Sequence, residues 1–273
     1  MTQSEEPITQ PDEVGDKYKL ARESLKLGRE AIGHGHELLQ EIKAHINDAR
    51  ARGGINQQLW DAERISGEHA RYFSQSGQDA FLEDHVFHGM REGTFVEIGG
   101  YDGITGSNCL FFELLRGWNG LMIEPSPAFF QLASQFRRCT CLDLAVAAVE
   151  GQAEFLNVRE GYRQMSGLVQ TYEPTLREQV EADPRYSGEV IEVRTRTLDA
   201  ILTDAGLHKI DYISLDVEGA ELAVLQGFPF EKYQITAWTV ENNTRDRRIP
   251  ELMAIKGYKR IEALGQDDVF VLG

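Results

Sequence analysis

The sequence predicts an α/β protein with a mostly parallel seven-stranded sheet that ends in an antiparallel hairpin and is preceded by a helical extension. After Tyr72, short β-rich apolar runs alternate with amphipathic stretches, which is typical of βαβ units. The last two runs are separated only by Gly265-Gln266, too few residues for a crossover helix, so they should pair as a hairpin. Before Tyr72, apolar residues instead repeat every seven positions, which indicates a helix.

The seven expected strands are short apolar runs, each followed by turn residues. They lie at residues 94–98, 121–124, 140–144, 211–216, 235–241, 259–264 and 268–272. An insertion at residues 150–197 carries two more such runs, 153–158 and 190–197, and is expected to form a hairpin-like elaboration. We therefore divide the chain into a helical extension, residues 1–70, and an α/β domain, residues 71–273.

The heptad in the extension leaves two interpretations open. One seam carries Tyr18, Leu25, Ile32, Leu39 and Ile46, which suits a coiled coil and a homo-oligomer formed through this helix. The companion seam and its surroundings contain three glycines, each of which costs a helix interior about 1 kcal/mol relative to alanine. The alternative is a helix that packs on its own domain.

Composition narrows the function classes. The chain has 273 residues, 41% of them hydrophobic, and a net charge of −16, which disfavours nucleic acids and anionic membranes as partners. The cysteines, Cys109, Cys139 and Cys141, are odd in number and lack zinc-type spacing, so a reducing compartment is expected. Residues 1–16 are polar without a secretory signal, and no run approaches the roughly 18 apolar residues of a membrane span. These features predict a soluble, cytoplasmic protein.

The strongest local motif is the run from Glu97 through Gly99, Gly100 and Tyr101. A buried strand ends in an acid and enters a glycine-rich turn, where backbone can approach a ligand closely and the next helix, near Ser107-Asn108, offers free N–H groups. Tyr101 occupies the place of the second glycine of a dinucleotide fingerprint and would crowd a pyrophosphate. A smaller carboxylate fits better. The alternative is a tight turn whose glycines serve packing alone.

Two further acids follow the next two strands. Glu124 comes about 20 residues after the glycine turn, the spacing of an acid that binds ribose hydroxyls. Asp143 ends the third strand, where a carboxylate can accept from an adenine amino group. Either acid could instead be a solvated residue at a strand end.

A third group of oxygen-bearing side chains follows the fourth and fifth strands. Asp216, Glu241 and Asn242 should emerge together at the carboxyl edge of the sheet, where they suit a hard cation such as Mg²⁺ that acidifies a substrate hydroxyl. Helix capping or direct substrate binding without a metal is an equal alternative. Glu218 and Glu221 are candidate bases, or simply solvated acids.

Taken together, these motifs resemble the FkbM-type methyltransferases, a branch of the Rossmann-like class I S-adenosylmethionine-dependent fold. The resemblance spans roughly residues 72–273 and rests on five segments: Ser74–Asp79, Glu97–Gly103 with Ser107-Asn108, Glu124-Pro125, Leu215–Glu221 and Thr239–Asn242. The extension before residue 70 lies outside it.

The resemblance implies methyl transfer from S-adenosylmethionine to a hydroxyl of a sugar, glycan or polyketide. It places Glu97, Gly99, Gly100, Tyr101, Ser107 and Asn108 around the methionine part, Glu124 at the ribose, Asp143 on the adenine side and Gln78 over the cofactor. Asp216, Glu218 and Glu241 are then the catalytic candidates, with Mg²⁺ on Asp216, Glu241 and Asn242.

Two alternatives from other classes remain. A nicotinamide-dependent oxidoreductase would also use a glycine turn and a ribose acid, but Tyr101 and the terminal hairpin argue against it. A non-catalytic scaffold would keep the sheet as an inert module and assemble through the helix. The acceptor itself is set by the insertion and neighbouring loops and carries no motif.

Overall fold

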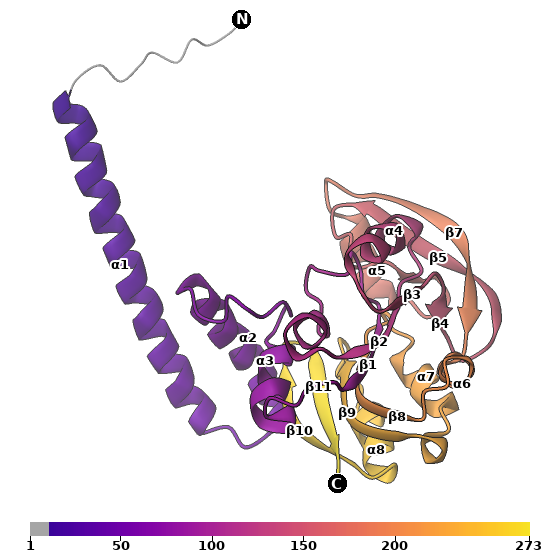
Figure 1. Cartoon of the computed structure of the whole chain (residues 1–273). Coiled ribbons are helices and arrows are strands. Elements are labelled where there is room, and N and C mark those ends of the chain that lie inside the picture. Colours follow the sequence, from indigo (N-terminus) through magenta and orange to yellow (C-terminus); the bar gives the residue numbers. More distant parts are fainter. Residues whose placement is uncertain (1–10) are drawn as a thin grey trace, which may run out of the picture.

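The computed structural model describes residues 11–273 (Figure 1). Residues 1–10, most of the polar start for which the sequence predicts no secretory signal, lie outside the described part. Among the described helices, none is both long and apolar enough to cross a membrane.

The main sheet has seven strands in the order β10–β11–β9–β8–β1–β2–β3. The pairs β3–β2, β2–β1, β1–β8 and β8–β9 are parallel, whereas β11 pairs antiparallel with both β9 and β10. The predicted Rossmann-like sheet with a terminal hairpin is therefore confirmed. The strands are β1 Thr94–Ile98, β2 Asn119–Ile123, β3 Thr140–Leu142, β8 Lys209–Leu215, β9 Gln234–Glu241, β10 Tyr258–Leu264 and β11 Asp267–Leu272.

Helices cover both faces of this sheet because successive strand residues point to opposite sides. On β1, Val96 packs with the helices of one face and Phe95 with those of the other. The first face carries α6 (Leu198–Asp204), α7 (Glu221–Gly227), the 3₁₀ turn η3 (Phe230–Lys232) and α8 (Arg248–Ile255). The second carries α3 (Gln78–Leu82), the π-helical turns η1 (Glu83–Phe87) and η2 (Phe112–Arg116), and α4 (Pro127–Phe136).

The insertion, together with β4 just before it, builds a second sheet beside the first (Figure 1). Its strand order is β4–β7–β5–β6, and the long antiparallel pair β5–β7 agrees with the expected hairpin-like elaboration. The sequence did not predict the flanking strands or the helix α5 (Pro174–Glu181). The four strands are β4 Ala145–Val146, β5 Gly151–Glu160, β6 Gly167–Leu168 and β7 Ser187–Arg196.

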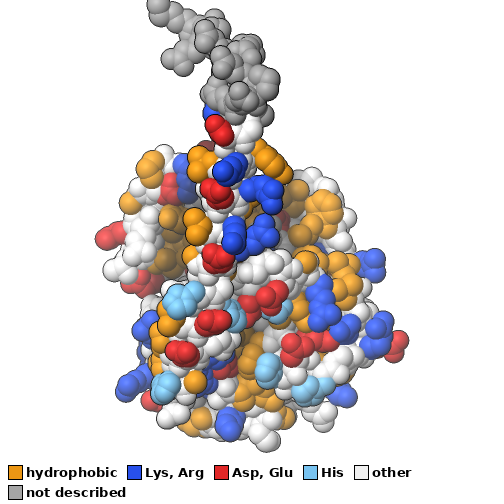
Figure 2. All heavy atoms as spheres, turned by 90° about the vertical axis from the view of Figure 1, so that its left-hand side faces the viewer, with side chains coloured by type: hydrophobic (Ala, Val, Ile, Leu, Met, Phe, Trp, Pro, Cys, Tyr) orange, Lys and Arg blue, Asp and Glu red, His pale blue; other side chains and the backbone are white. Residues whose placement is uncertain are grey.

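The extension forms two helices that differ in their surroundings. Helix α1 (Pro11–Ala44) projects away from the body of the molecule, and hydrophobic side chains alternate along it with lysines and arginines (Figures 1 and 2). Its heptad residues Tyr18 and Leu25 are 66% and 63% exposed. The predicted heptad is thus helical from Tyr18 to Leu39, whereas Ile46 lies between α1 and α2, and the second half of α1 contacts α2 through the His36–Glu63 pair at 2.9 Å.

Helix α2 (Ala49–Ile65) packs directly on the terminal hairpin. Its Asn56 donates from Nδ2 to the Ala263 carbonyl at 2.6 Å in a buried contact, and Arg52 forms an ion pair with Glu262 at 3.0 Å. A Cβ on Gly53 would lie 2.8 Å from the carbonyl oxygen of Gly265, so only glycine allows this close approach. Helix α2 is therefore packed against the edge of the main sheet that the terminal hairpin forms. The boundary at residue 70 stays a prediction.

Candidate functional site

The carboxyl ends of β1, β2 and β8 are joined into one rim by backbone hydrogen bonds. Gly99 N–H donates to the Ile123 carbonyl at 2.9 Å, and Asp216 N–H donates to the Ile98 carbonyl at 3.2 Å. The loops that follow these parallel strands consequently start at the same edge of the sheet, where ligands of open α/β sheets bind.

Gly99 makes this junction sterically feasible. Its φ is +81°, and a Cβ at this position would lie 2.0 Å from the carbonyl oxygen of Asp216. Both the left-handed backbone and the contact require glycine. Gly100 is constrained differently: it donates to the Ile123 carbonyl, and a Cβ there would meet the Met122 side chain.

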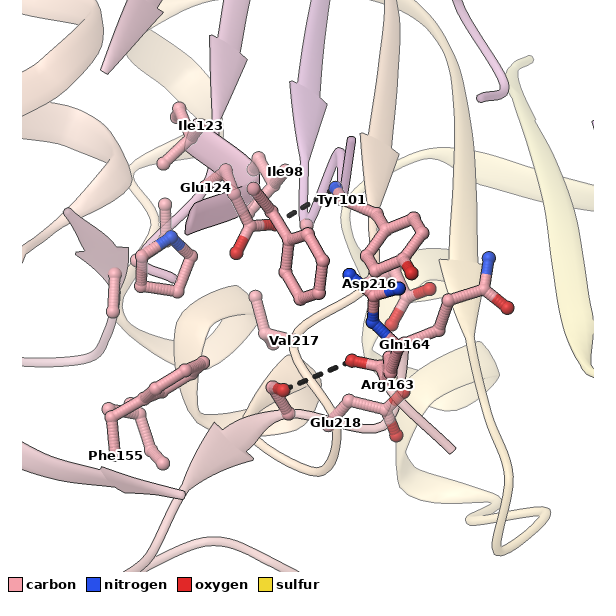
Figure 3. Close-up of a pocket in the computed structure, with 17 residues that line it drawn as sticks. Ile98, Tyr101, Ile123, Glu124, Phe155, Arg163, Gln164, Asp216, Val217 and Glu218 are labelled. Atoms are coloured by element: carbon pink, nitrogen blue, oxygen red, sulfur yellow. Dashed lines mark hydrogen bonds between the residues drawn. The ribbon is translucent and has the colours of Figure 1, made fainter. Parts of the chain in front are cut away.

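The rim encloses a cavity with an empty volume of about 540 Å³, its open mouth included; we call it the rim cavity (Figure 3). Its polar end carries Tyr101, Asp216 and Glu218, and Phe155 lies at the opposite end. The wall beyond the polar groups is largely hydrocarbon, contributed by Ile123, Pro125, Phe129, Val146, Phe155 and Leu168. The cavity is thus amphipathic: the acids that follow β2 and β8 lie on one side, and the aromatic side chains of Phe129 and Phe155 contribute to the apolar wall.

Glu124 lines the rim cavity directly after β2. Its Oε1 accepts from Ser126 N–H at 2.8 Å and its Oε2 from Tyr101 N–H at 2.9 Å. Burial raises the pKa of Glu124 to about 8, against the opposing effect of these two N–H donors. Each oxygen keeps a lone pair for a ligand hydroxyl.

Tyr101 closes the cavity beside Glu124. It takes a left-handed backbone, φ 50°, and its ring lies 4.2 Å from that of Phe129. The guanidinium of Arg163 covers the other approach to Phe129, 5.0 Å from its ring centroid. Sequence reasoning missed Arg163, whose only signal was its place in the insertion.

Asp143 follows β3 but is exposed and is not among the residues that line the rim cavity. It lies close enough to raise the pKa of Glu124 further through charge repulsion, after the main effect of burial. Its predicted role beside an adenine stays a prediction.

Glu97 is only 3% exposed, and its carboxylate is satisfied within the protein. It accepts from Ser107 Oγ at 2.8 Å and from Asn108 N–H at 2.8 Å, and it pairs with Arg137 at 2.6 Å. Arg137 also pairs with buried Glu113 at 2.6 Å. This network, which sequence reasoning missed, fixes the glycine turn to the segment that begins at Ser107. Glu97 and Ser107 line neither cavity described in this section.

A group of carboxylates occupies the rim next to Gly99. Oxygens of Asp216, Glu221 and Glu241 lie within 4.8 Å of one another, the one such cluster of at least three metal-type ligands found among residues 11–273. Burial, then repulsion from Asp267 and Glu221, raises the pKa of Asp216 to about 8. Burial and the neighbouring acids also raise the pKa of Glu241 well above its ordinary value. The cluster therefore favours protons, a cation or a positively charged ligand.

Two other predicted residues border this cluster. Glu218 is 6% exposed, with a left-handed backbone and a buried Oε2 that has no protein partner; burial raises its pKa well above the usual range. Asn242 lies next to Glu241, but its amide donates to Asp268 and accepts from Asp246 N–H at 2.7 Å. Glu221 is thus the third carboxylate of the cluster, and the amide of Asn242 is hydrogen-bonded within the protein.

Asp216 also borders a second, larger cavity with an empty volume of about 1160 Å³, its open mouth included; we call it the polar cavity. Gln78 and Asn108, both predicted from sequence, line it. Gln78 donates to Asp267 at 2.9 Å and Asn108 donates to Ser214 Oγ at 2.9 Å, which leaves the buried Oδ1 of Asn108 without a protein partner. Some of the predicted residues thus line one or other of two cavities that meet at Asp216, whereas Glu97, Gly100, Ser107, Asp143 and Asn242 line neither.

Comparisons with known proteins give one family match and several similar solved structures. A family model described as the methyltransferase FkbM domain matches residues 97–260. A solved FkbM methyltransferase from Methylobacillus flagellatus is 13% identical, with a TM-score of 0.41 over 85% of this chain and 57% of its own. This chain therefore spans little more than half of that structure's length.

Two other solved structures are similar at 10% identity and a TM-score of 0.38. One is a TehB-like SAM-dependent methyltransferase from Corynebacterium glutamicum, over 82% of this chain and 100% of its own. The other is fibrillarin from Aeropyrum pernix with natively bound S-adenosyl-L-methionine, over 71% of each chain. No curated protein matches the sequence.

Stability should depend on pH through Glu124. Its pKa is about 8 in the folded state and 4.5 as an isolated group, so the folded chain holds a proton that the unfolded chain has lost. This contribution is complete below about pH 4.5 and disappears as the pH rises towards 8. We expect the wild type to lose on the order of 2–4 kcal/mol of unfolding free energy relative to Glu124→Gln between about pH 5 and pH 8.

Urea titrations of both proteins at the two pH values measure this difference. Glu231→Gln, at an exposed position on η3, should follow the wild type. Parallel behaviour of wild type and Glu124→Gln would mean that Glu124 is already ionised in the folded state at the lower pH.

Proposed function

Because the chain belongs to the FkbM methyltransferase family, we propose that it transfers the methyl group of S-adenosylmethionine to a hydroxyl oxygen of an acceptor. The observation that carries the proposal is the rim cavity, where the loops after β1, β2 and β8 bring Gly99, Glu124 and Asp216 to one opening. The family match and Tyr101 at the glycine turn both favour this function over a nicotinamide-dependent oxidation.

The two ends of the rim cavity suit the two ends of the adenosine. Glu124 has lone pairs free for ribose hydroxyls, and the slot between Phe129, Phe155 and Leu168 offers apolar surface to a flat base. Bound S-adenosylmethionine supplies a methyl group on a positively charged sulfur. The surplus of acids around Asp216 stabilises that charge.

We assign Asp216 as the general base because it lines both the rim cavity and the polar cavity. Glu241 lies next to it in the carboxylate cluster. As the oxygen–methyl bond forms and the sulfur–methyl bond breaks, the hydroxyl proton passes to a carboxylate oxygen of Asp216. In its ionised form, Asp216 with a pKa of about 8 is a stronger base than an ordinary aspartate carboxylate. The rest of the acceleration comes from holding the acceptor oxygen in line with the methyl group.

We also propose that a divalent cation binds at the carboxylate cluster. Three carboxylates within 4.8 Å of one another form a hard, oxygen-only donor set that fits Mg²⁺. Asp216, Glu221 and Glu241 would each hold it through one carboxylate oxygen, which would leave the other oxygen of Asp216 for the proton, and the ion would lower the pKa of the acceptor hydroxyl. Asn242, expected from sequence as a ligand, has its amide committed to Asp246 and Asp268.

Two further expectations accompany the proposal. The acceptor is a hydroxyl of a sugar, glycan or polyketide-type molecule. The exposed apolar seam of α1, with Tyr18 and Leu25, pairs with a second copy of the chain, and light scattering on the full chain measures that assembly.

Cofactor binding should depend on Glu124. In Glu124→Gln, the side-chain NH₂ group would face the N–H of Tyr101 or Ser126, so two donors would point at each other. One hydrogen-bond acceptor for the ribose would also be lost. Calorimetry at about pH 9 keeps Glu124 ionised, because this pH lies above its pKa of about 8. Loss of a hydrogen bond to a charged group is worth about 1.5–3 kcal/mol, so we expect the Kd for S-adenosylmethionine to rise roughly ten- to a hundredfold. Glu231→Gln serves as the matched control, and equal affinities of the two variants would exclude Glu124 from the ribose site.

The requirement for a cation is tested separately by chelation. If Asp216, Glu221 and Glu241 hold Mg²⁺, exhaustive chelation should abolish methyl transfer and added Mg²⁺ should restore it, with S-adenosylmethionine binding largely retained. Activity that persists after chelation would exclude a catalytic metal, and the proposed mechanism would then rely on Asp216 as the base.

A further inference from the structure

The polar cavity has a wall that the family match does not include. Residues 97–260 carry the match, whereas α2 contributes Arg50, Gly54, Gln57, Gln58 and Asp61 to this cavity. Helix α2 is held on the hairpin by the buried Asn56–Ala263 hydrogen bond and by the Arg52–Glu262 ion pair. The wall is thus a fixed part of the molecule.

The lining of the polar cavity is almost free of hydrocarbon side chains. Opposite α2 it consists of Gln75, Ser76, Gln78, Gly106, Asn108, Asp216, Glu241, Arg245, Gly265, Gln266 and Asp267. Amide side chains dominate, and each offers both donors and an acceptor. A hydroxyl group also donates and accepts, so a ligand with several hydroxyls can pair with such a surface without leaving buried groups unsatisfied.

The charges around the polar cavity disfavour an anionic ligand. Four acids line it, Asp61, Asp216, Glu241 and Asp267, against two arginines. One of these, Arg50, already donates to the carbonyls of Gly265 and Asn242 and to Gln266 Oε1. A phosphate or carboxylate would add a further acid to a cavity where acidic side chains already outnumber the arginines and repel one another.

We propose that the polar cavity is the acceptor site, that it takes a neutral polyhydroxylated acceptor, and that α2 determines its specificity. The inference rests on the proposed methyl transfer, because it places the acceptor on the far side of Asp216 from the rim cavity. Asn108 and Asp216 form the inner end, beside the reacting groups. Gln57, Gln58 and Asp61, which α2 contributes to the same lining, would contact the remainder of the acceptor.

Gly54 provides a test that avoids every proposed catalytic residue. It is exposed on α2, lines the polar cavity, and has no atom within 4 Å of the position of its Cβ. Gly54→Leu therefore adds bulk to the cavity without a clash, and leucine has a higher helix propensity than glycine. Gly28→Leu is the matched control, because Gly28 is an exposed helical glycine of α1 with equally open surroundings.

The experiment measures ligand binding by saturation-transfer NMR with the full chain loaded with S-adenosylhomocysteine. The probes are neutral methyl glycosides, the corresponding uronic acids, and apolar phenols. We expect the neutral glycosides to bind, Gly54→Leu to weaken them at least about fivefold, and Gly28→Leu to leave them unchanged. Calorimetry should give the same S-adenosylhomocysteine affinity for all three proteins.

The outcomes separate the two proposals. Absent S-adenosylhomocysteine binding overturns the proposed methyl transfer itself. If the cofactor product binds but neutral glycosides do not, if uronic acids or phenols bind in their place, or if Gly54→Leu behaves as Gly28→Leu, the acceptor assignment is wrong and the proposed methyl transfer remains.

Discussion

The close approach of Gly99 to the carbonyl oxygen of Asp216 is the constraint on which the site depends. A Cβ on residue 99 would lie 2.0 Å from that oxygen, so the two loops can meet only because one of them carries no side chain there. The contact keeps the end of β1 against the end of β8, and the bonds from Gly99 and Gly100 to Ile123 add the end of β2. The rim cavity is the space that these three strand ends leave open.

Charge is the second feature that links structure to function. Burial raises the pKa of Glu124 and Asp216 to about 8 and that of Asp267 to about 6. The protein thus concentrates carboxyl groups at sites where each one disfavours ionisation of the others. The free energy of unfolding of the ligand-free chain should therefore fall as the pH rises and these groups ionise. Such clusters are typical of functional sites, where a positively charged ligand removes the penalty.

The sequence predicted the sheet and much of the rim for a local reason. Strand patterning and turn residues place the ends of β1, β2, β8 and β9, and parallel strands bring those ends to a single edge. Gly99, Glu124 and Asp216 could therefore be assigned to one site from position alone. The family motifs added Gln78 and Asn108, which the structure places in the polar cavity.

Contacts between distant segments escaped sequence reasoning. Glu97 is occupied by Arg137, forty positions away, and nothing in either local pattern indicates the pair. Glu221 joins the acidic cluster because its carboxylate, at the start of α7, accepts from the N–H groups of Val217 and Gly219, a detail of backbone geometry. Likewise, the heptad predicts the helix that α1 forms but does not indicate that α2 lines a cavity.

Hydrogen exchange with and without S-adenosylhomocysteine tests the central claim most directly. If the three strand ends form one binding site, the ligand should slow exchange together at residues 99–101, 124–126 and 216–219, while the exposed half of α1 stays unchanged. Protection confined to one of these loops, or located elsewhere in the chain, would contradict the account.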